Sequence, residues 1–146
     1  MNDQNQPVEH LAKLLNQQKL RLQQVLATLA EELDAIKYRN GTLMIEISEK
    51  KQLQLEAIKN ADAHFSDDDS INIIKTSPQL TQLKNDITEL LVQCQTQNEI
   101  CYLTASQNQM AVEQVKNLLV GGSKSTTYNE QGLKNSAGSL SKGIKA

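Results

Sequence analysis

The sequence predicts an all-α protein: an elongated antiparallel helical hairpin or coiled coil, followed by a disordered C-terminal tail. Apolar residues recur every seven positions over two long stretches, the pattern by which helices pack along a narrow seam. Aromatic residues make up 3% of the chain and apolar residues 38%, too little for a thick globular core. Residues 121–146 are rich in Gly, Ser and Lys and carry no such stripe. We therefore divide the chain into a helical domain, residues 1–120, and a flexible tail, residues 121–146.

The first helix is expected over about residues 8–60. Pro7 suits an early helical position, where its missing N–H is harmless, and Glu9 suits the positive end of a helix. The seven-residue row and its companion row four residues on consist of Leu15, Leu22, Leu29, Ile36 and Leu43, with Leu26, Leu33 and Ile47. Arg39-Asn40-Gly41 resembles a helix end, which would give two helices instead of one. Because Ile36 and Leu43 keep the same register across it, we favour one helix with a kink near Gly41.

Residues 61–77 interrupt the pattern and are where we expect the chain to reverse. The acidic run Asp67–Asp69 lacks the alternating ligands, the central Gly and the closing Glu of a calcium-binding loop, so we read it as a solvated turn. We expect four apolar residues of this segment to pack back onto the helices, namely Phe65, Ile71, Ile73 and Ile74.

A second helix is expected over residues 78–120, because Ser77-Pro78 places a capping residue before a proline at the first helical position. Its rows are Leu80, Ile87, Cys94, Cys101, Asn108 and Val115, with Leu91, Asn98, Ala105, Val112 and Leu119. A buried Asn such as Asn98 can set the register of a helix pair. The alternative is that this weaker half of the stripe is left available for a partner helix.

Charge and motif content argue against several function classes. Residues 121–146 carry four Lys and one Glu, so the net charge of −2 divides into +3 on the tail and −5 elsewhere. Neither value suits nucleic-acid binding or an anionic membrane. No apolar run is long enough to insert into a membrane and no secretory signal is apparent, so we expect a cytoplasmic protein. No phosphate loop, metal-ligand set or nucleophile–base pair can be found, so we expect neither catalysis nor a cofactor.

The last third of the chain combines a heptad-striped helix ending in Asn108-Gln109-Met110-Ala111-Val112-Glu113-Gln114-Val115-Lys116-Asn117-Leu118-Leu119, a short Gly/Ser/Lys spacer, and Tyr128-Asn129-Glu130-Gln131-Gly132. In this order of elements the chain resembles the FlgN family of flagellar export chaperones. The N-terminal half is also similar, through Glu32, Ala35-Ile36, Arg39-Asn40, Glu49-Lys50 and Leu53.

This resemblance implies a chaperone of the flagellar type III secretion system, which binds C-terminal helical segments of hook-associated proteins at the hook–filament junction. Such a chaperone prevents premature assembly of these proteins and delivers them to the export gate. Tyr128 and Gly132 would dock on the cytosolic domain of the export-gate membrane protein, and the export ATPase is a further candidate partner.

The residues themselves indicate where a cargo helix could bind. We expect the cargo contacts on the last helix, at Leu103, Met110, Val112, Val115, Leu118 and Leu119. In the tail, Leu133, Ala137, Leu140 and Ile144 share one helical face that could fold on binding, although we favour chance spacing in a disordered tail as the explanation. The alternative functions are a generic coiled-coil adaptor or assembly subunit, with a homodimer left open, and a regulator that sequesters another protein's helix.

Overall fold

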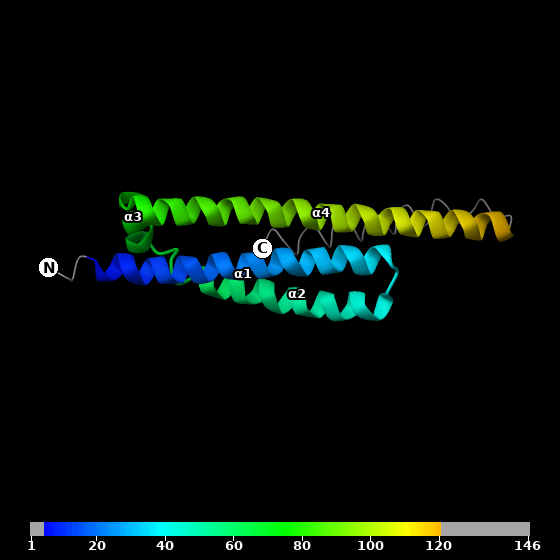
Figure 1. Ribbon diagram of the computed structural model, residues 1–146, viewed down its shortest axis with the longest axis horizontal. Coiled ribbons are helices and arrows are strands. Elements are labelled where there is room, and N and C mark those ends of the chain that lie inside the picture. The colour runs from blue at the N-terminus through cyan, green and yellow to red at the C-terminus, as the bar shows by residue number, and fades with distance from the viewer. Residues whose placement is uncertain (1–4, 121–146) are drawn as a thin grey trace.

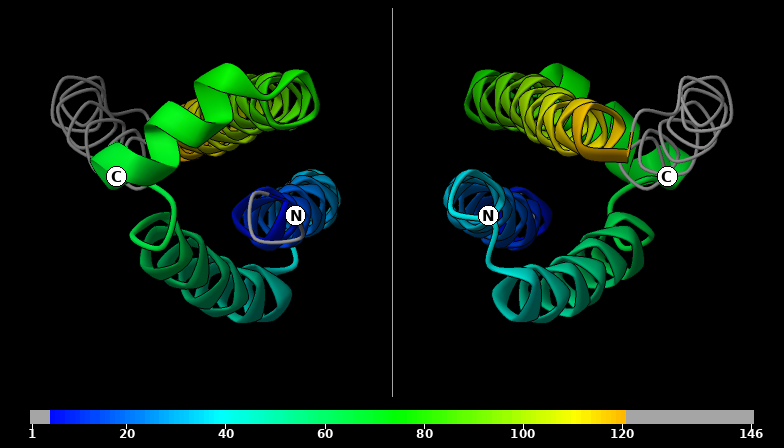
Figure 2. Two further views of the ribbon diagram at one scale, coloured as in Figure 1. Left: turned by 90° about the vertical axis from the view of Figure 1, so that its left-hand side faces the viewer. Right: turned by 90° about the vertical axis from the view of Figure 1, so that its right-hand side faces the viewer.

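The computed structural model describes residues 5–120 and contains four helices. These are α1 (Gln6–Lys37), α2 (Gly41–Asp62), the short α3 (Asp68–Thr76) and α4 (Pro78–Val120). The all-α class is confirmed, and each long helix runs opposite to the one before it, as the hairpin prediction required (Figure 1). Two such reversals leave α1 and α4 parallel, with α1 between α2 and α4 (Figures 1 and 2).

The prediction of one helix over residues 8–60 was wrong. Helix α1 ends at Lys37, Arg39 adopts a left-handed backbone conformation with φ 55°, and α2 begins at Gly41. The Asn40 side chain caps α2 by accepting a hydrogen bond from the Leu43 backbone N–H at 3.1 Å. The matching register of Ile36 and Leu43 was therefore a coincidence between two helices that pack antiparallel.

Helix α3 lies within the segment that was expected to be a loop. Asp67 caps it by accepting a hydrogen bond from the Ser70 backbone N–H at 3.2 Å and one from the Ser70 hydroxyl at 2.6 Å. These bonds hold the pKa of the Asp67 carboxyl below its ordinary value. Asp68 and Asp69 occupy the first turn, where negative charge stabilises a helix. The acidic run thus starts a helix.

Within residues 5–120 the core is thin and has two clusters, both built around α1. One joins Leu11 and Leu15 to Leu80 and Ile74, with Phe65 and Ile73 packed against it. The expectation of folding back is therefore confirmed for Phe65, Ile73 and Ile74, whereas Ile71 belongs to neither cluster. The other cluster is formed by Leu22, Val25, Leu29 and Cys94. Helix α4 begins at Pro78 as predicted, with the Ser77 hydroxyl accepting a hydrogen bond from the Leu80 N–H at 3.4 Å.

Candidate functional site

Helices α1 and α4 are held in register by a ladder of hydrogen bonds that repeats every seven residues. Each rung runs from an α4 side chain to the α1 carbonyl oxygen 72 positions earlier. The constant difference shows that the two helices run parallel with a fixed register. The rungs are Cys94 Sγ to Leu22 O at 3.6 Å, Cys101 Sγ to Leu29 O at 3.4 Å, and Asn108 Nδ2 to Ile36 O at 2.9 Å.

The ladder stops because α1 stops. Val115, seven residues after Asn108, would need a partner at position 43, but α1 ends at Lys37 and the chain has already turned into α2. Helix α4 continues to Val120, so residues 109–120 extend about 18 Å past the last rung. Figure 1 shows this end of α4 projecting beyond the turn between α1 and α2. We call residues 109–120 the overhang.

Four of the six predicted cargo-binding residues lie together on the overhang. With 100° between successive residues of a helix, Val112, Val115, Leu118 and Leu119 fall within an arc of about 120°. Their exposed fractions are 40%, 55%, 85% and 81%. This arc continues the α4 face that is buried against α1 closer to the N-terminus, and we call these four residues the seam end.

The other two predicted residues do not belong to this group. Met110 and Leu103 are seven residues apart and share one face, which is about 120–140° around the helix from Val115. Both are about half exposed. A single straight helix lying on the seam end would therefore leave Leu103 and Met110 to the side.

The turn between α1 and α2 forms the inner boundary of the site and is positively charged. Residues 37–45 include Lys37 and Arg39 and no acidic residue. Both side chains are exposed, and among the described residues no ion pair involves either of them. Tyr38, 82% exposed, and the exposed Ile45 add apolar surface there. The overhang itself is neutral, since Glu113 and Lys116 pair at 3.9 Å.

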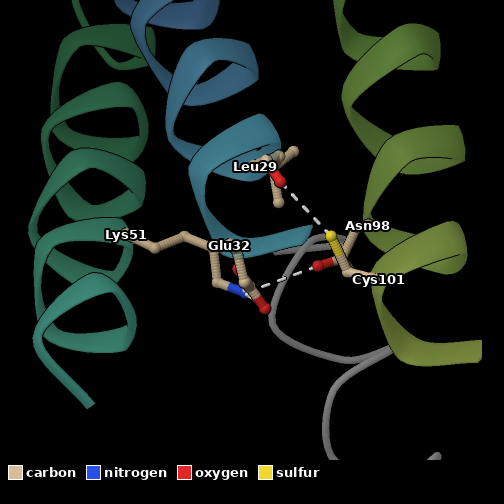
Figure 3. Close-up of polar contacts among 5 residues, drawn as sticks. All are labelled: Leu29, Glu32, Lys51, Asn98 and Cys101. Atoms are coloured by element: carbon tan, nitrogen blue, oxygen red, sulfur yellow. Dashed lines mark hydrogen bonds and ion pairs between the residues drawn. The ribbon is translucent and has the colours of Figure 1, made fainter. Parts of the chain in front are cut away.

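A polar layer joins all three long helices beside the Cys101 rung of the ladder (Figure 3). Lys51 Nζ of α2 lies 2.8 Å from Glu32 Oε2 of α1 and donates a hydrogen bond to Asn98 Oδ1 of α4 at 3.4 Å. Asn98 is buried, as expected for a residue that sets register. Sequence spacing does not reveal the partners of Lys51, because only the antiparallel return of α2 brings it beside Glu32 and Asn98.

Burial also alters the two cysteines. Desolvation raises the pKa of both thiols, and together with the nearby Glu32 carboxylate it raises that of Cys101 to about 11. Each thiol lies in the core and donates to an α1 carbonyl, so both act as apolar residues with one weak hydrogen bond.

The rest of residues 5–120 offers little for chemistry. No three His, Cys, Asp or Glu of this range are placed to bind a metal ion. A shallow open depression between α1 and α4 is lined by side chains that do not ionise, namely Leu26, Ala30, Val92, Gln93, Thr96 and Gln97. None of the four described helices has the length and apolar character needed to cross a membrane.

The predicted tail sites lie outside the described residues. These are Tyr128 and Gly132 for gate docking, and Leu133, Leu140 and Ile144 for folding on binding. Comparison of the chain with protein-family models, with curated proteins and with solved structures gives no match in any of the three.

Proposed function

We propose that this protein is a non-enzymatic export chaperone that binds an amphipathic helical segment of its cargo on the overhang of α4. The cargo class that the sequence resemblance suggests is the C-terminal segment of a hook-associated protein. While bound, that segment is unable to join its own assembly, and the chaperone carries it to the flagellar export gate.

This proposal is supported by the face of α4 that packs against α1 and continues beyond the point where α1 ends. The face of α4 that is buried against α1 through Asn108 continues as Val112, Val115 and Leu119, where α1 has ended. A helix laid on this end would meet apolar side chains at the same heptad spacing that α1 meets elsewhere on α4.

The magnitudes indicate what the cargo must contribute. Covering the exposed fractions of the seam end would stabilise a complex by about 5 kcal/mol on this chain's side, at roughly 1.5–3 kcal/mol per fully buried side chain. Lost translational and rotational freedom opposes association by about 4–15 kcal/mol. Micromolar binding therefore requires a cargo segment with a comparable apolar face of its own.

Delivery is the second half of the proposal and is based on the tail sequence. Tyr128, in a Gly/Ser/Lys setting, has the amphipathic ring that commonly anchors protein interfaces. We propose that it docks with Gly132 on the cytosolic domain of the export-gate protein, apart from the cargo site. Replacing Tyr128 by Ala should then weaken gate docking and spare cargo binding.

The decisive experiment compares two double variants that add the same charge to the same helix. Val115→Asp with Leu119→Asp alters the seam end, whereas Leu103→Asp with Met110→Asp alters the other face. Isothermal titration with the C-terminal segment of a hook-associated protein from the same organism should show binding lost in the first variant and retained in the second. Circular dichroism should show near-normal helicity in both.

Two outcomes would contradict the proposal. If the unaltered protein does not bind the segment at micromolar concentration, the chaperone function is wrong. If sedimentation equilibrium shows a dimer that Val115→Asp with Leu119→Asp dissociates, a second copy covers the seam end and the adaptor or assembly-subunit alternative is favoured.

A further inference from the structure

We propose that the bound helix lies in line with α1 and parallel to α4, with an acidic N-terminal turn against Lys37 and Arg39. This inference rests on the proposed function and adds the polarity and charge of the segment that the site accepts.

The ladder defines the position of the helix. Each rung pairs an α4 residue with the α1 residue 72 positions earlier, and the last rung pairs Asn108 with Ile36. A helix that continues this pairing past Lys37 lies on Val112, Val115 and Leu119 as an extension of α1. The overhang gives it about three turns of contact, since 18 Å is about three times the helical pitch.

Charge at the turn defines the polarity. A helix in this position has one end beside the exposed side chains of Lys37 and Arg39, which have no described ion-pair partner. Acidic side chains are favoured in the first turn of a helix and basic ones in the last. An acidic first turn would pair with both cations, whereas a basic last turn would be repelled by them.

The neighbouring helix ends are compatible with the same polarity. The carbonyl end of α1 faces the overhang and carries partial negative charge, which favours the N–H end of a following helix. Helix α2 starts at the same turn with no acidic residue in its first turn, so the partial positive charge of its N-terminus, where Asn40 caps only the Leu43 N–H, also favours a nearby carboxylate. The reverse polarity would place two carbonyl ends, both of partial negative charge, against each other.

Site-directed spin labelling can read the polarity directly. Cys94 and Cys101 are buried, so a nitroxide reagent at neutral pH would label an introduced exposed cysteine selectively. Tyr38→Cys places the label at the turn, and Val120→Cys places it at the far end, on a side chain 82% exposed and about 140° from Val115. The probe is the ¹⁵N-labelled C-terminal segment of a hook-associated protein.

We expect the label at position 38 to broaden resonances at the N-terminal end of the bound segment, and the label at position 120 to broaden those at its C-terminal end. The opposite pattern overturns the inferred polarity and leaves the proposed function standing. Absence of binding to the unlabelled protein overturns the proposed function and this inference with it.

A charge-reversal pair tests the role of the turn. Lys37→Glu with Arg39→Glu should weaken binding by about tenfold at low salt, as expected for two exposed ion pairs. It should also reduce the salt dependence of binding. The control, Lys59→Glu with Lys84→Glu, changes the net charge equally at exposed positions far from the turn. Equal weakening by both variants would show a general charge effect and overturn the role of Lys37 and Arg39.

Discussion

The end of the seam at Asn108 can be tested with one substitution made at two positions of very different burial. Val25 lies in the core and is 1% exposed, whereas Val115 lies on the overhang and is 55% exposed. Val25→Ala removes two buried methyl groups, worth about 1.6 kcal/mol of transfer free energy, and leaves a cavity in a thin core. We expect it to lower the free energy of unfolding by about 2.5 kcal/mol and Tm by about 10 °C.

Val115→Ala should behave differently. Its side chain is half exposed, and Ala has the higher helix propensity by about 0.5 kcal/mol, so the free energy of unfolding should stay within about 0.5 kcal/mol of the original. Urea unfolding followed by circular dichroism at 222 nm measures both variants under the same conditions. If Val115→Ala lowers the free energy of unfolding nearly as much as Val25→Ala does, the unbound protein already covers Val115. That result would refute the conclusion that the seam end is exposed.

Three further results are expected. Lys51→Met should lower the free energy of unfolding by about 2 kcal/mol, because Glu32 and Asn98 lose their partner. Lys51→Met with Glu32→Leu should lower it by less than about 1 kcal/mol. A double variant as unstable as the single variant would contradict this account. The unfolded thiol of Cys101 loses its proton near pH 9 and the folded thiol near pH 11, so urea titrations should show stability falling between these values, and less so in Cys101→Ala. Asn40→Ala should cost about 1 kcal/mol in thermal unfolding, because the Leu43 N–H loses its cap, and no change in Tm would rule the cap out.

The sequence predicted much of α4 correctly because its signals are local. Ser77-Pro78 specifies a helix start through the capping hydroxyl and the fixed φ of proline, and the structure has that start. The buried residues of α4, including the polar Asn98, all lie in the predicted heptad rows, but the same rows also contain the exposed Leu91 and the exposed residues of the overhang. An exposed second half of the α4 stripe was predicted only as an alternative, because the exposure of the overhang depends on where α1 ends.

The break at Tyr38–Asn40 was missed because two signals conflicted. Asn40 followed by Gly41 favours a turn, while the register of Ile36 and Leu43 favours continuity, and periodicity was given more weight. Leu43 is 38% exposed and Ile36 is buried, so the two never shared a row. Heptad spacing repeats by chance across short gaps, whereas a capping side chain has a specific partner.

Grouping the predicted cargo residues by apolar character and sequence position also did not show that they lie on two faces of α4. Leu103 and Met110 were grouped with Val115 for being apolar and near it in sequence. Helical geometry separates them by about 120–140°, and the ladder to α1 shows which face is the seam.

At Arg39, stability of the fold and binding of the cargo favour different residues. A side chain at φ 55° disfavours the folded state by about 1–2 kcal/mol relative to glycine, so Arg39→Gly should make the turn easier to form. If the cation at this position attracts the cargo, the same change would leave a more stable protein that binds less well. Selecting variants of this chain for heat resistance alone would then favour loss of that charge, and with it loss of cargo recognition.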